Sequence, residues 1–74
     1  MNTKTLATII DDAYGQGHTS GTVVTDSGHE YTFNIPENPC IVTDNDGMLY
    51  LQEAGTNRHV FMPCSKVEHI TFIP

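Results

Sequence analysis

The first part of the chain places apolar side chains at helical spacing. They fall at positions i, i+3, i+4, i+7 and i+8, and are Leu6, Ile9, Ile10, Ala13 and Tyr14. This spacing predicts an amphipathic helix over residues 3–14. Asn2 or Thr3 is placed to cap its first turn, and Gly15 followed by Gly17 ends it. A helix of about 12 residues does not persist alone in water, so its apolar stripe must pack against the rest of the chain.

From Gly21 onward the apolar period changes to two, which is typical of β-strands. Strands are expected at residues 22–25, 31–35, 40–43, 48–53, 59–62 and 67–73. Turn-forming residues separate several of them, in the segments Asp26-Ser27-Gly28, Asp44-Asn45-Asp46-Gly47 and Gly55-Thr56-Asn57. The segment from Pro36 to Pro39 breaks the ladder, because proline donates no backbone hydrogen bond.

Short strands joined by tight turns are typical of an antiparallel meander. Closing such a sheet on itself removes its exposed edges. The pattern therefore predicts a mainly β chain with an N-terminal α-helix, folded as a small five- to six-stranded antiparallel barrel. Residues 1–74 form one domain, with the helix at about residues 3–14 and the strands across about residues 21–73.

The chain length makes the hydrophobic core thin. With 74 residues, of which 38% are hydrophobic, there is room for one core, and chains of this size often add a partner subunit. Leu49 and Leu51 alternate toward the inside, which leaves Tyr50 on the outer face. We therefore predict an oligomer interface that uses outward residues and the final edge strand. Its candidate residues are Tyr50, Phe61, His69 and Thr71.

The charge is lopsided, with nine acidic residues against Lys4, Arg58 and Lys66 and a net charge of −6. Nucleic-acid affinity depends largely on Lys and Arg, so this balance disfavours a phosphate backbone as partner. It favours a basic partner.

The chain shows no basic run leading into an apolar stretch, and no apolar segment approaches the roughly 20 residues of a membrane span. We therefore expect a cytoplasmic protein.

Cys40 and Cys64 are expected to be free buried thiols, with a single bridge between them as the alternative.

Three motifs that would carry chemistry are incomplete. The Asp-rich turn before Gly47 echoes a calcium loop, but Val42 falls at its first ligand position. His59, His69 and Cys64 lack the close spacing of structural zinc sites. The same residues offer a thiol and a base without any marked oxyanion stabiliser. We expect no metal, no cofactor and no enzymatic activity.

The expected order of helix, strand, turn, long bent strand, hairpin, short loop and final strand resembles the Sm-like (LSm and Hfq type) small barrel, an SH3-like architecture. Gly28 fits the turn glycine of the first motif of that family, and Asp44 fits its Asp position. The Asn position of the motif falls at Met48. The second motif falls on residues 61–67, with Pro63 and Cys64 in place of its Arg and Gly.

The resemblance implies a homo-oligomer in which the last two strands pair between subunits. It also implies that a ligand is held by two loops, whose residues here are Asp44, Asn45, Met48, Cys64, Ser65 and Lys66. The family residues that read RNA are replaced, so the scaffold is expected without the usual RNA contacts.

The leading hypothesis is a non-enzymatic binding module that self-associates, with an unidentified ligand. Two alternatives remain open. One is an RNA or small-nucleotide binder that uses the two loops. The other is an acidic inhibitor of the phage or mobile-element kind that docks on a basic protein surface.

Overall fold

The computed structural model describes residues 1–35, 37–43 and 45–73. Its elements are α1 (Thr3–Gly15), β1 (Ser20–Thr25), β2 (Glu30–Asn34), β3 (Cys40–Thr43), β4 (Met48–Gln52), β5 (His59–Pro63), the 3₁₀ turn η1 (Cys64–Lys66) and β6 (Val67–Ile73). The predicted helix and all six predicted strands are confirmed, with ends that differ by no more than two residues. Only the 3₁₀ turn was not foreseen.

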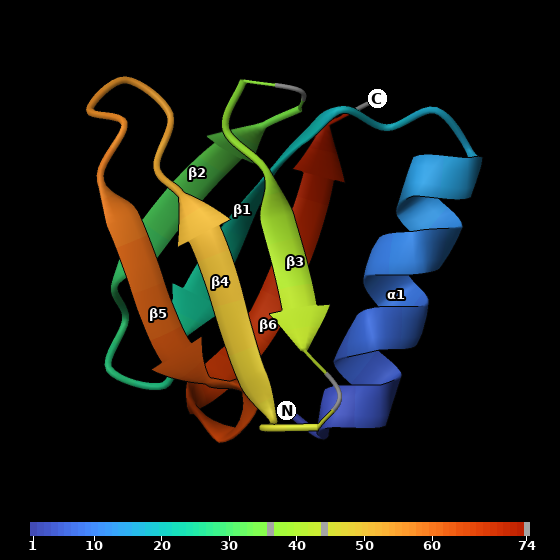
Figure 1. The fold of residues 1–74 in the computed structure, drawn as a ribbon, viewed down its shortest axis with the longest axis vertical. Coiled ribbons are helices and arrows are strands. Elements are labelled where there is room, and N and C mark those ends of the chain that lie inside the picture. Colours follow the sequence, from blue (N-terminus) through green and yellow to red (C-terminus); the bar gives the residue numbers. More distant parts are fainter. Residues whose placement is uncertain (36, 44, 74) are drawn as a thin grey trace.

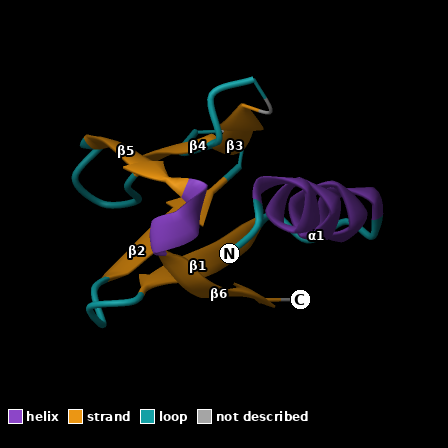
Figure 2. Cartoon of the chain, turned by 90° about the horizontal axis from the view of Figure 1, so that it is seen from below, coloured by secondary structure: helices purple, strands orange, loops and turns teal. Residues whose placement is uncertain are grey.

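The strands form two antiparallel sheets of three strands each, in the orders β2-β1-β6 and β3-β4-β5. In Figure 1 the second sheet lies in front of the first. Figure 2 shows the two sheets facing each other, with α1 at one open side between them. The mainly β fold with an N-terminal helix is thus confirmed. Within the described ranges the sheets do not close into the expected barrel.

The break between β2 and β3 explains why the two sheets are separate. The chain doubles back there, and Asn34 and Asn38 exchange backbone hydrogen bonds of 2.9 and 2.6 Å in an isolated bridge. Pro39 follows directly and has no N–H to continue a ladder. Beyond it, β3 continues as a strand of the other sheet.

Three hydrogen bonds tie the connection between β4 and β5 to this corner. The amide of Ala54, after β4, donates to the carbonyl of Thr32 in β2 at 2.8 Å. The buried Asn38 side chain donates to the Glu53 carbonyl at 3.3 Å and to Oδ1 of Asn57 at 2.9 Å. Each of these donors therefore has a partner, as buried polar groups require.

The helix begins at Asn2, whose Oδ1 accepts hydrogen bonds from the amides of Lys4 (2.9 Å) and Thr5 (3.2 Å). This settles which of the two predicted caps is used. Of the predicted stripe, Leu6, Ile10 and Ala13 are buried. The helix packs against β3 and η1. At 13 residues it is too short to cross a membrane, and the described part of the chain contains no other helix that could.

The core lies between the two sheets and under α1. Its fully buried side chains come from both sheets and from the helix, and include Phe33, Leu6, Leu49, Leu51, Val23 and Val67. The inward direction predicted for Leu49 and Leu51 is confirmed, since neither is exposed to solvent. The alternation along β4 then turns Tyr50 outward.

Candidate functional site

The outer surface of the β3-β4-β5 sheet carries two of the three exposed large hydrophobic side chains among the described residues, Ile41 and Phe61. Ile41, Tyr50 and Phe61 are register partners and form one row across the three strands. Ile41 is 50% exposed and Phe61 is 67% exposed. We call this surface the outer face, and define it by the outward side chains Ile41, Thr43, Met48, Tyr50, Gln52, His59, Phe61 and Pro63.

The aromatic residues of the outer face contact one another. The rings of Tyr50 and Phe61 lie 4.9 Å apart between centroids, and those of Tyr50 and His59 lie 5.8 Å apart and are stacked. The Tyr50 hydroxyl and Nδ1 of His59 are hydrogen-bonded at 2.7 Å. Two of the predicted interface residues, Tyr50 and Phe61, are therefore brought together.

The other two predicted interface residues lie on the other sheet. His69 and Thr71 are exposed on β6, next to the exposed Ile73. As far as the described residues show, β6 pairs only with β1, and β5 pairs only with β4. The candidate interface is thus divided between the two sheets, with Tyr50 on the central strand β4, Phe61 on the edge strand β5, and His69 and Thr71 on the edge strand β6.

The two loops predicted to hold a ligand lie side by side. The amide of Cys64, at the start of η1, donates to the carbonyl of Gly47 in the β3–β4 turn at 2.8 Å. Asn45, Ser65 and Lys66 are exposed there, and Met48 is half-buried.

One of the six predicted ligand residues does not add to this surface, and another lies outside the described residues. The Cys64 side chain is completely buried and packs in the core, so it has no surface to offer a ligand. Asp44 lies outside the described residues.

A small groove lies where the β1–β2 turn, β5 and η1 meet. It has a volume of about 280 Å³, and its lining includes Tyr31, His29, Phe61 and Lys66. The rings of His29 and Tyr31 stack at 6.4 Å between centroids. Sequence reasoning did not join Tyr31 to Phe61, because nothing in the strand pattern indicates that β2 and β5 lie close together.

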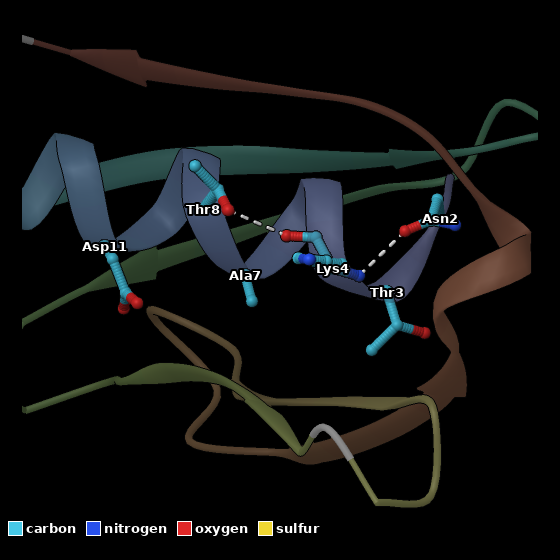
Figure 3. A pocket seen from close by; sticks show the side chains of 6 residues that line it. All are labelled: Asn2, Thr3, Lys4, Ala7, Thr8 and Asp11. Carbon is cyan, nitrogen blue, oxygen red and sulfur yellow. Dashed lines mark hydrogen bonds between the residues drawn. The ribbon is translucent and has the colours of Figure 1, made fainter.

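A larger hollow of about 570 Å³ follows the exposed side of α1 (Figure 3). Its polar groups are already engaged in the helix, since Asn2 caps the first turn and the Thr8 hydroxyl donates to the Lys4 carbonyl at 2.9 Å. What remains is the Thr3 hydroxyl, one cation, Lys4, and one anion, Asp11, on an open surface. This arrangement offers no nucleophile with an adjacent base.

The two cysteines are free and buried. Burial raises the pKa of the Cys40 thiol to about 12, with a smaller contribution from nearby Cys64. A thiol held neutral in this way is a poor nucleophile and a poor metal ligand. Within residues 1–35, 37–43 and 45–73, no three His, Cys, Asp or Glu side chains gather in a group that could hold a metal ion.

The raised pKa of Cys40 predicts a loss of stability in alkaline solution. An unfolded chain releases the thiol proton near its ordinary pKa of 9.0, whereas the folded chain keeps it to about pH 12. Unfolding therefore becomes easier as the pH rises above 9, by up to about 1.4 kcal/mol per pH unit. Urea unfolding at several pH values between 8 and 11 measures this slope. The Cys40→Ala variant should show a shallower slope, and an equal slope in both proteins would contradict the prediction.

Comparison with family models, with curated proteins and with solved structures gives no match to this chain. The fold class is therefore defined by the structure alone: a helix followed by two three-stranded antiparallel sheets. The candidate site combines the apolar outer face, the edge strands β5 and β6, and a pair of adjoining loops.

Proposed function

We propose that this protein is a non-enzymatic binding module of the cytoplasm that self-associates through the open edges of β5 and β6. In this proposal it is an Sm-like small-barrel oligomer whose ligand is unidentified. The observation that carries the proposal is that β5 and β6 each have one described partner strand and so leave one edge open. β2 and β3 are edge strands as well, and the Sm-like resemblance selects β5 and β6 among the four. Pairing β5 of one copy with β6 of the next satisfies both edges at once.

The composition of the two edges supports this pairing. Proteins usually protect an exposed edge strand with lysine, proline or a bulge. β6 contains neither lysine nor proline, and β5 has proline only at its last residue, Pro63. The pairing of β6 with β1 is irregular at Glu68, but residues 70–73 are paired regularly and their open edge carries no such protection. Apolar side chains flank both edges, among them the exposed Phe61 and Ile73. Left without a partner, such edges would favour aggregation.

The strand order is also compatible with the Sm-like resemblance. If β2 and β3 together represent the long bent strand of that family, the last two strands are β5 and β6. The open edges then fall on the strands that the family pairs between subunits. The family implies a closed barrel, whereas in this proposal a single chain would form only part of that barrel.

A charge placed on β6 tests the proposal. We expect Thr71→Glu to lower the average mass of the assembly, because it introduces a charge beside the paired edges. Thr32→Glu is the matched control, since Thr32 and Thr71 are both exposed and both are register partners of Thr22. Sedimentation velocity over about 10–500 µM, a range suited to weak association, measures the mass. A wild-type protein that stays monomeric throughout would refute the proposal.

The second candidate function is binding of RNA or a small nucleotide by the two loops. The contact between Cys64 and Gly47 favours it, because it brings the loops together. Lys66 is the only cation in these loops, and the chain has a net charge of −6, so we expect weak and strongly salt-dependent binding at most. Titration of labelled A-rich and U-rich RNA at two salt concentrations decides this. Affinity that persists at the higher salt would favour the RNA function.

A further inference from the structure

The outer face differs from the rest of the molecule in its charge. β3, β4 and β5 contain no Asp, Glu, Lys or Arg, although the chain carries nine acidic residues. Two copies with a net charge of −6 repel each other wherever acidic groups meet. The outer face is a surface on which two copies can approach without that cost. A basic partner, in contrast, finds no acidic side chain there.

The polar groups of the outer face are largely paired within the face. The Tyr50 hydroxyl is engaged with Nδ1 of His59 at 2.7 Å, and the Thr43 hydroxyl donates to the Met48 carbonyl at 3.2 Å. A polar group that is buried without a partner is costly, so a face that is to be covered needs such pairing in advance. The centre of the outer face can therefore be covered by an apolar surface and leave these groups satisfied.

We infer that the outer face binds the outer face of a second copy, as a two-fold dimer in which the two sheets pack against each other. The inference rests on the proposed self-association and adds a second contact, distinct from the pairing of β5 with β6. Sheets packed face to face lie about 10 Å apart, with their inner side chains interdigitated. The row of Ile41, Tyr50 and Phe61 supplies the apolar side chains for such packing.

The charged residues at the two ends of the sheet indicate whether the two-fold axis runs along the strands or across them. Asp46 is exposed in the turn at one end of β3 and β4, and Arg58, with its side chain 63% exposed, precedes β5 at the other end. An axis parallel to the strands would place the two Asp46 side chains at the same end of the dimer. An axis across the strands separates them and brings Asp46 of one copy toward the end of the other copy where Arg58 is paired with Glu53 at 3.2 Å. It also places Ile41 against Ile41 and Phe61 against Phe61.

Two variants separate this contact from the edge contact. We expect Ile41→Glu to halve the mass of the wild-type assembly, because the new charge would be buried against Ile41 of the second copy. Thr71→Glu should leave the face-to-face dimer, and the double variant should be a monomer. Thr32→Glu remains the control that changes neither contact. Far-ultraviolet circular dichroism and urea unfolding verify that each variant is folded.

The possible results distinguish the two proposals. If Ile41→Glu has the wild-type mass while Thr71→Glu lowers it to one chain, the edge contact stands and the face-to-face dimer is refuted. If the wild-type protein is a monomer, both proposals fail. If Thr71→Glu is without effect and Ile41→Glu yields a monomer, the face-to-face dimer stands alone.

Crosslinking tests the direction of the axis. The native cysteines are buried, so a cysteine introduced at Ile41→Cys is the accessible thiol, and wild-type protein is the control. With the axis across the strands, a short bis-maleimide should link Ile41→Cys to itself in high yield. With the axis along the strands, linkage would require a mixture of Ile41→Cys and Phe61→Cys. Crosslinking in the mixture but not in Ile41→Cys alone would contradict the inferred arrangement.

Discussion

Gly21→Ala should be among the most destabilising single substitutions in this protein. Gly21 is buried in β1, and a Cβ at this position would meet the carbonyl oxygen of Thr71 and would lie 2.9 Å from Cζ of Phe33. The oxygen belongs to the backbone of a paired strand, so it cannot move aside cheaply. We expect a loss of about 3 kcal/mol in the free energy of unfolding, and a fall in Tm of roughly 15 °C.

Gly15→Ala is the matched control for that substitution. Gly15 ends α1, and a Cβ there meets no atom within 4 Å. Its φ is not in the left-handed region, so alanine should be neutral or stabilise the helix by up to about 1 kcal/mol. Thermal and urea unfolding of both variants measure the difference. A Gly21→Ala protein as stable as Gly15→Ala would show that β1 and β6 are not as close as the structure places them.

Ile10→Ala should also be strongly destabilising, by about 2–5 kcal/mol. Ile10 is 3% exposed and packs in the core between the helix and the sheets. The substitution leaves a cavity under a helix that is too short to be stable by itself. We therefore expect loss of helical signal to coincide with global unfolding in a urea titration.

Ile9→Ala makes the same chemical change one residue earlier. Ile9 is only half-buried and is not part of the core cluster, so the loss should be below about 1 kcal/mol. The ratio between the two variants measures how firmly α1 is oriented. Similar losses at both positions would indicate that the helix does not present Ile10 to the core as described.

Ile9 and Ile10 also show how far the sequence alone could reach. Helical spacing placed both in one stripe, and this is correct for the direction of the stripe. Periodicity indicates which face of a helix is apolar. It does not indicate which residues within that face the sheets will bury. The difference between the two residues arises from the position of β3 and η1 against the helix.

The candidate site also has one part that the sequence predicted and one part that it could not predict. The alternation along β4 predicted that Tyr50 faces outward, and its neighbours Leu49 and Leu51 are indeed buried. The partner of Tyr50 could not be predicted, because cross-strand neighbours depend on register. The register sets Ile41 and Phe61 on either side of Tyr50 and thereby creates the outer face.

Cys64 marks the limit of reasoning from a family motif. The resemblance placed it in a ligand-binding loop, whereas its side chain is completely buried. The loop is nevertheless where the resemblance put it, since the amide of Cys64 bonds to Gly47 in the other loop. A motif indicates where a segment lies, but the direction of each side chain follows from the local backbone, here a 3₁₀ turn.

The sequence by itself determined the order, type and approximate ends of the helix and the six strands, because these follow from local periodicity and turn residues. It also determined the acidic charge. The absence of charged residues from β3, β4 and β5 depended on the strand ends of the structure, because the predicted strand at residues 48–53 included Glu53. Only the tertiary structure decided that the strands divide into two sheets, that β5 and β6 keep open edges, and that an apolar row crosses one sheet. These features depend on contacts between residues far apart in the chain, which local patterns do not specify.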